Sequence, residues 1–163
     1  MNTLIIVAIT LLFAYTLTVC VVNRGVPSSL SATVYTLQPM GAWLWTLIIG
    51  AVAGLTMPVI IERTEDTWQF LAFLSCAGLL AVAICPLIPD KGDMTYRIHV
   101  GGAILSAVAS QVLVAIECPW LLLGWVLWLA AFIWFSKEHV WKQQIFWAEM
   151  TCFAITFSLC FVQ

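Results

Sequence analysis

Six apolar stretches, separated by short polar breaks, fill almost the whole of this 163-residue chain. A helix needs about 20 apolar residues to cross roughly 30 Å of bilayer hydrocarbon. The stretches therefore predict an all-α fold, a polytopic transmembrane bundle of about six helices in one integral membrane domain, residues 1–163. The predicted spans are 3–22, 42–61, 69–88, 98–117, 119–135 and 145–162.

Composition agrees with a bilayer environment and narrows the function classes. The chain is 63% hydrophobic and 9% charged, whereas a soluble domain is about 25% charged. A net charge of −2 is too small to favour a nucleic-acid partner. The chain contains no phosphate-cradling glycine loop and no GxSxG motif. We expect no nucleic-acid partner and no cofactor.

The basic residues predict the orientation, because cytoplasmic loops are enriched in Lys and Arg. One side of the predicted bundle has a single basic residue, Arg63, beside three acidic ones. This bias predicts that both termini are non-cytoplasmic and that the chain lies in a bacterial-type plasma (inner) membrane. The other side carries Arg24, Lys91, Arg97, Lys137 and Lys142.

The longest break contains a segment, 28–37, with its own pattern. Leu30, Val34 and Leu37 fall on one helical face, which predicts a short helix lying at the membrane interface. The alternative is a re-entrant segment whose hydroxyls line a cavity, since irregular backbone at depth needs protein or water to satisfy it.

Two predicted spans carry small residues at steps of four, a spacing that lets helices approach closely. Gly50 and Gly54 lie in the second span, and Gly102, Ser106 and Ser110 lie in the fourth. We expect both stripes to be helix-packing faces and the fourth span to be the most buried. A line of polar and small residues adjoins the second stripe, and it predicts either plain packing or a groove running inward. That line is His99, Ala103, Ala107 and Gln111.

Nine tryptophans make the chain tryptophan-rich. Most lie near predicted span ends, where an amphipathic ring suits the headgroup layer. Trp125 and Trp128 lie deeper, in the fifth span. We interpret them as packing residues, with an aromatic pocket for a flat apolar ligand as the alternative.

Two ionisable residues fall inside predicted spans, where charge is costly and marks a candidate site. His99 begins the fourth span, and Glu149 lies about one turn into the sixth. The predicted topology puts both near the cytoplasmic face. Structural roles, such as a pair between Glu149 and Arg97, are the alternative. The full candidate polar site is His99, Glu149, Ser31, Asp90, Asp93, Arg97 and His139.

Ser31, Asp90, His99 and His139 resemble the polar set of the intramembrane hydrolase superfamily that includes alkaline ceramidases and adiponectin-receptor-like proteins. The resemblance implies a zinc ion near the cytoplasmic face, held here by His99, His139 and Asp90. That family has seven helices and an HxxxH pair near the C-terminus. This chain has about six predicted spans and no histidine in the last one.

We therefore expect binding in preference to catalysis. The favoured function is a small integral membrane protein that binds membrane lipid, a hydrophobic ligand or a partner helix at the cytoplasmic ends of the fourth and sixth spans. A zinc-dependent lipid hydrolase at the same face is the enzyme alternative. A small transporter or channel working as a homo-oligomer is the third.

Overall fold

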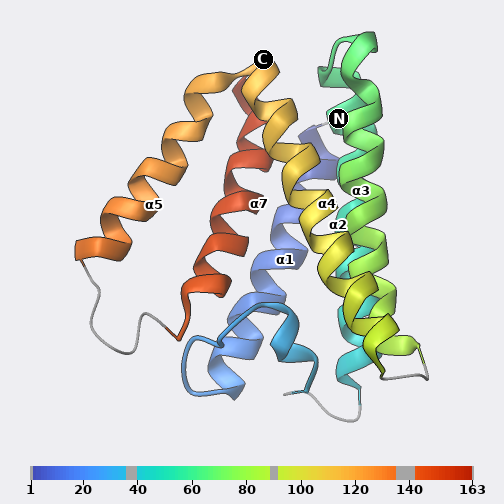
Figure 1. The fold of residues 1–163 in the computed structure, drawn as a ribbon, viewed down its shortest axis with the longest axis vertical. Helices are drawn as coiled ribbons and strands as arrows, with labels where there is room; N and C mark the ends of the chain where they lie inside the picture. Colours follow the sequence, from blue (N-terminus) through green and yellow to red (C-terminus); the bar gives the residue numbers. More distant parts are fainter. Residues whose placement is uncertain (1, 36–39, 89–91, 135–141, 163) are drawn as a thin grey trace.

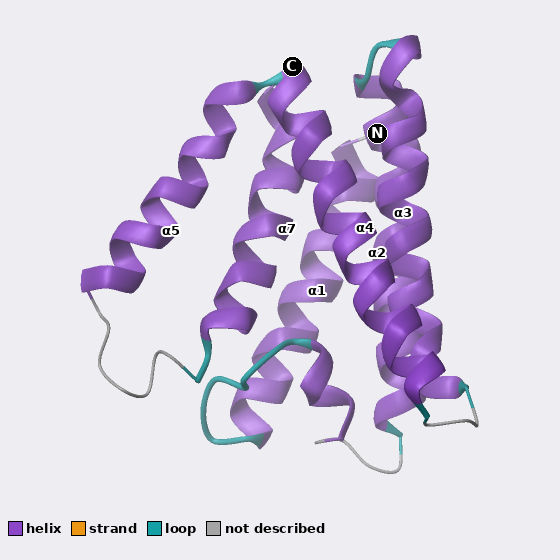
Figure 2. Ribbon diagram, viewed as in Figure 1, coloured by secondary structure: helices purple, strands orange, loops and turns teal. Residues whose placement is uncertain are grey.

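The structure, a computed structural model, describes residues 2–35, 40–88, 92–134 and 142–162. Within these ranges the chain is all-α (Figures 1 and 2). The α-helices are α1 (Asn2–Val22), α2 (Gly41–Arg63), α3 (Gln69–Ile84), α4 (Asp93–Glu117), α5 (Leu123–Trp134) and α7 (Gln144–Val162). The 3-10 helices are η1 (Ser31–Tyr35), η2 (Asp66–Trp68), η3 (Cys85–Leu87) and η4 (Pro119–Leu122).

Five helical segments are long and apolar enough to cross a membrane, which makes this a membrane-embedded chain. They are α1, α2, the continuous run Asp66–Leu87, α4 and α7. The remaining predicted span, the fifth at 119–135, is shorter, with four residues in η4 followed by 12 in α5. That length extends about 25 Å, less than the roughly 30 Å of a hydrocarbon core. The count of six spans stays a prediction.

Successive helices alternate in direction, and both ends of the chain lie at the same end of the bundle (Figure 1). We call the opposite end, where α1 finishes and α2, α4 and α7 begin, the loop end. Arg24, Arg97 and Lys142 lie there, whereas Arg63 closes α2 at the other end. The described basic residues are thus segregated along the bundle axis.

Helices α3 and α4 approach closely at Gly78 and Gly102. A Cβ added to Gly78 would lie 2.5 Å from the carbonyl oxygen of Gly102 and 2.6 Å from the amide nitrogen of Ser106. A Cβ on Gly102 would lie 2.8 Å from the carbonyl oxygen of Gly78. Ser110, further along the stripe, is also buried. Only glycine fits at the contact, because a side chain there would collide with backbone.

The close approach expected at Gly50 and Gly54 is not found among the described residues. A Cβ on either glycine would have nothing within 4 Å, and Gly54 is exposed. The buried face of α2 instead contains Trp45, Ile49 and Val52. The rotation of α2 about its axis, which its packing partners set, leaves both glycines without a close helix neighbour.

The prediction that the fourth span is the most buried is also wrong. A smaller share of its apolar window is buried than in the other four long spans. Its Gly102 and Ser110 face is buried, while Ile104 and Val108 are more than half exposed. A helix packed along one stripe leaves its other face to the surroundings.

The segment before α2 differs from the predicted interfacial helix over 28–37. It forms a five-residue 3-10 helix, Ser31–Tyr35, and Leu37 lies outside the described residues. Leu30 is 2% exposed and Thr33 is 0% exposed. The segment therefore packs into the loop end of the bundle and does not lie on its surface.

Hydrogen bonds attach this segment to the first and last helices. The hydroxyls of Tyr15 on α1 and Thr33 share a bond of 2.6 Å. The amide of Phe146 on α7 donates to the carbonyl of Ser28 at 3.2 Å. The segment thus bridges α1 and α7, the first and last of the described helices.

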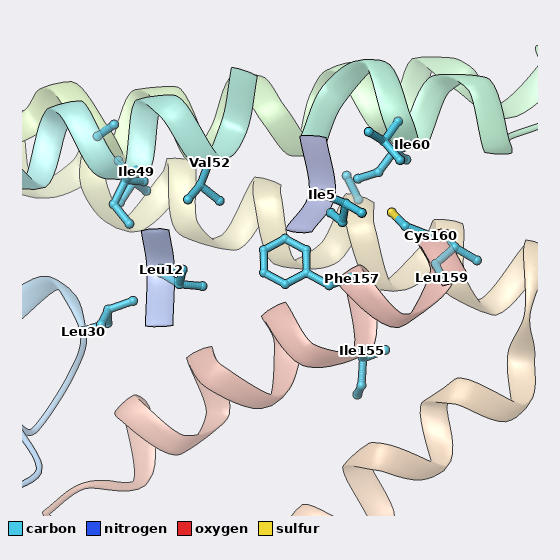
Figure 3. Close-up of a cluster of buried hydrophobic side chains, with 14 of the residues drawn as sticks. Ile5, Leu12, Leu30, Ile49, Val52, Ile60, Ile155, Phe157, Leu159 and Cys160 are labelled. Atoms are coloured by element: carbon cyan, nitrogen blue, oxygen red, sulfur yellow. The ribbon is translucent and has the colours of Figure 1, made fainter. Parts of the chain in front are cut away.

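A cluster of buried apolar side chains joins α1, α2, α7 and the segment at Leu30 (Figure 3). Leu12, Ile49 and Leu30 meet at one end of the cluster, with Phe157 further along it (Figure 3). Ile155 points the other way, towards α5, where a Cβ on Gly124 would lie 2.8 Å from its side chain.

Polar groups of α4 also attach α5 to the bundle. The Trp125 indole donates to the side-chain oxygen of Gln111 at 2.8 Å, and the Gln111 amide donates to the Thr156 hydroxyl at 3.1 Å. An interhelical amide of this kind replaces the water that is absent at membrane depth. α5 has no buried residue of its own, so the Trp125–Gln111 bond and the contact of Gly124 with Ile155 help to hold it against α4 and α7.

Candidate functional site

A narrow cavity of about 110 Å³ lies among α2, α3, α4 and α7, with the η1 segment at its loop end. Its wall runs from His99 to Ser110 along α4 and from Glu149 to Phe157 along α7. Those eleven residue steps along α4 correspond to roughly 16 Å at 1.5 Å per residue. The small volume over that length makes the space, hereafter the inner cavity, elongated and thin.

A wider space of about 480 Å³ adjoins the inner cavity at the loop end, and we call it the vestibule. Its wall includes Ser29, Thr95 and Tyr96. Ser31 and His99 line both spaces. These two side chains therefore stand where the vestibule meets the inner cavity.

Glu149 reaches this junction from α7. Its Oε2 accepts a hydrogen bond of 2.6 Å from the backbone amide of Leu30, the residue just before η1. The first amides of a helix have no partner inside the helix. The Glu149 carboxyl satisfies one of them, and the hydroxyl of Ser29 satisfies a second, the amide of Ala32 at 3.1 Å.

Most of the hydroxyls deeper in the inner cavity already make hydrogen bonds within the protein, with Ser106 as the exception. Four of them donate to backbone carbonyls of the bundle at 2.8–3.2 Å, so they offer little polarity to a ligand. The wall beyond the junction thus behaves as apolar. The pairs are Thr56 to Val52, Ser75 to Ser106, Ser110 to Ala107 and Thr156 to Cys152.

The inner cavity also reaches the side of the bundle. Ala103 and Ala107 line it, yet Ala103 is exposed and Ala107 partly buried. α4 and α7 diverge towards the loop end (Figure 1). The inner cavity therefore opens beside α4 at Ala103, at the depth of the predicted hydrocarbon.

The structure brings together three of the seven candidate site residues. Ser31, His99 and Glu149 line the inner cavity from η1, α4 and α7. Asp93 and Arg97 are exposed at the start of α4 and line neither the inner cavity nor the vestibule.

The remaining two candidates, Asp90 and His139, lie outside the described residues. The implied zinc set of His99, His139 and Asp90 is therefore not brought together by any described geometry. Within residues 2–35, 40–88, 92–134 and 142–162, no three His, Cys, Asp or Glu residues are grouped as metal ligands would be.

The sequence indicated one feature of the site and gave no indication of two others. Ala103 and Ala107 follow His99 at steps of four, the line that predicted a groove running inward. The bond between Glu149 and the Leu30 amide has no such signal, because it joins positions 119 residues apart. Nor does the pairing of Tyr15 with Thr33, which the helix pattern leaves unspecified.

No protein-family model matches the chain. No curated protein and no solved structure matches it either.

Proposed function

We propose that this protein binds an amphipathic ligand of the membrane, a lipid or a molecule built like one. The polar head lies at the junction of Ser31, His99 and Glu149, and a single apolar chain extends into the inner cavity. One observation carries the proposal. The three polar side chains line the same end of a thin cavity whose remaining wall is mostly apolar or already hydrogen-bonded.

The side opening supports a ligand that arrives from the bilayer. Ala103 is exposed and also lines the inner cavity, so the route beside α4 opens where lipid chains would lie. A water-soluble ligand would have to leave water to use it. Small-molecule sites commonly combine apolar walls with a few placed polar groups.

We place the loop end, with its vestibule, on the cytoplasmic side of a bacterial-type plasma membrane. The support is the segregation of Arg24, Arg97 and Lys142 from Arg63, since cytoplasmic loops carry the excess of basic residues. The ligand head then sits near the cytoplasmic headgroup layer.

Filling the inner cavity tests the proposal. Ala107→Phe adds a ring to the wall between α4 and α7, and the matched control is Ala131→Phe, an exposed position on α5. Each protein is purified in a mild detergent, and retained lipids are counted by native mass spectrometry. We expect wild type and Ala131→Phe to retain one lipid-like molecule and Ala107→Phe to lose most of it.

Equal retention in all three proteins would contradict the proposal, as would a wild type that retains no specific molecule after exposure to total membrane lipid. Circular dichroism and a melting curve establish that Ala107→Phe is folded. Should it fail to fold, Ala103→Leu narrows the same opening with a smaller group, and the same loss is expected.

The hydrolase and transporter alternatives stay predictions from the sequence. Metal analysis of the purified chain tests the first, since a zinc hydrolase requires stoichiometric zinc. Flux into proteoliposomes tests the second.

A further inference from the structure

We infer that the ligand's head is an aliphatic ammonium group, and that the ligand is a single-chain amine rather than a fatty acid or a phosphate-bearing lipid. This inference rests on the proposed function and names the chemical class of its ligand. It follows from the charge at the junction, the acceptors there and the shape of the inner cavity.

The described charges at the junction favour a cation. Glu149 is acidic, and no lysine or arginine occurs among the described residues that line the inner cavity or the vestibule. Arg97, two positions before His99, is exposed and lines neither space. A carboxylate or phosphate head would meet the Glu149 carboxyl with no described cation to balance it. Unbalanced charge at membrane depth is costly.

The junction also offers acceptors in the number that an ammonium needs. An ammonium group has three donors and no acceptor, and a carboxylate has two oxygens that accept about four hydrogen bonds. One bond to Glu149 is taken by the Leu30 amide. Acceptor capacity remains on that carboxyl, on the Ser31 hydroxyl and on an unprotonated His99 nitrogen. The imidazole of His99 makes no hydrogen bond to another described residue.

The Leu30 bond also orients the carboxyl. Leu30 is held in place by the bridge between Tyr15 and Thr33 and by burial of its own side chain. A carboxyl fixed by a rigid backbone amide loses little further side-chain freedom when a ligand binds. Such preorganisation lowers the entropic cost of binding.

The shape of the inner cavity restricts the apolar part of the ligand. The cavity is roughly 16 Å long by the helix rise, and the centre of a water-sized sphere can occupy only about 110 Å³ of it. A linear alkyl chain matches a thin space of that length, whereas a fused ring system or two parallel acyl chains do not. Ile49, Leu79 and Phe153 are among its apolar wall residues.

The experiment compares three probes that share one alkyl chain and differ in their polar head group. Dodecylamine, dodecanol and dodecanoic acid are added at equal mole fractions to nanodiscs that contain the full chain. Occupancy is measured by native mass spectrometry, and Ala107→Phe gives the background for each probe. We expect wild type to bind the amine at least tenfold more tightly than the acid, with the alcohol between them.

The deciding variant is Glu149→Gln, which keeps a side-chain oxygen for the Leu30 amide but removes the charge. We expect it to weaken amine binding about tenfold and to leave alcohol binding within about twofold, a tenfold change corresponding to about 1.4 kcal/mol. The matched control is Glu117→Gln, at the other end of α4. Like Glu149, Glu117 accepts a hydrogen bond from a backbone amide, that of Glu65. The control variant is expected to bind all three probes as wild type does.

The outcomes separate the head inference from the proposed function. If the acid binds as tightly as the amine above the Ala107→Phe background, the ammonium inference is wrong and amphiphile binding stands. If no probe exceeds that background and no lipid is retained, both are wrong. The wild-type ratio decides the inference by itself should Glu149→Gln fail to fold.

Discussion

At the scale of single residues, Glu149 joins the stability of the fold to the candidate site. Its carboxyl is the partner of the Leu30 amide and also part of the inner-cavity wall. A carboxyl at membrane depth needs such partners, because water is scarce there. The sequence indicated that Glu149 was unusual, but its partner lies in the segment before α2 and only the folded chain shows it.

Tyr15 gives a prediction about the same segment. Its buried hydroxyl shares a 2.6 Å bond with Thr33, so Tyr15→Phe removes one bond and leaves the ring in place. Thr33 keeps its bond to the Leu30 carbonyl. We expect a loss of about 0.5–1.5 kcal/mol in the free energy of unfolding, measured by denaturation in detergent. Tyr96→Phe, at a 70% exposed position, is the control and should unfold as wild type does.

At the scale of elements, helix pairing depends on which small residues face each other. Gly78 and Gly102 meet at the crossing of α3 and α4, whereas Gly50 and Gly54 on α2 meet nothing within 4 Å. All four are glycines in apolar helices, and the GxxxG spacing of the second pair is the stronger sequence signal. The spacing predicts that a helix can pack closely, but the partner helix must present a complementary surface.

This difference predicts opposite outcomes for one substitution. Gly78→Ala places a Cβ 2.5 Å from a backbone oxygen, and overpacking of that kind costs about 1–3 kcal/mol. Gly54→Ala meets open space and gains about 1 kcal/mol of helix propensity on the scale for soluble helices. Unfolding in detergent should show a lower stability for Gly78→Ala and an unchanged or higher one for Gly54→Ala. Equal stabilities would contradict the crossing described above.

At the scale of the whole molecule, the described basic residues lie at two ends in unequal numbers. Arg24, Arg97 and Lys142 lie at the loop end and Arg63 at the other. The vestibule opens at the same loop end. Orientation and the proposed ligand access are therefore linked, because the head of the proposed ligand would lie on whichever side the loop end faces.

Labelling of introduced cysteines tests the orientation. In a variant with its six native cysteines replaced, Ser29→Cys lines the vestibule, and Glu65→Cys lies between α2 and η2 at the other end. In intact cells a membrane-impermeant maleimide should label Glu65→Cys and spare Ser29→Cys, because we expect the loop end to be cytoplasmic. The reverse pattern would invert the topology and leave the geometry of the inner cavity unaffected.

Sequence patterns predicted the elements well and the site in part. The predicted spans match the helices closely at most ends, but α4 begins at Asp93, five residues before the predicted start at 98. The segment 28–37 was expected as an interfacial helix and instead forms η1, with Leu30 buried. Of the candidate polar residues, Ser31, His99 and Glu149 converge, and Asp93 and Arg97 do not. Apolar run length predicts helices because it is local, whereas convergence depends on contacts between distant segments.

The sequence by itself determined that this is a membrane-embedded helical chain. In hydrocarbon every backbone group must be bonded within its own segment, so long apolar runs form helices regardless of their neighbours. The tertiary structure decided how each helix is rotated, which glycines meet and which polar side chains share the inner cavity. In lipid a helix gains little from burying apolar surface, so packing is selected by shape and hydrogen bonds between neighbours. Those partners, such as Glu149 and the Leu30 amide, are brought together only when the chain folds.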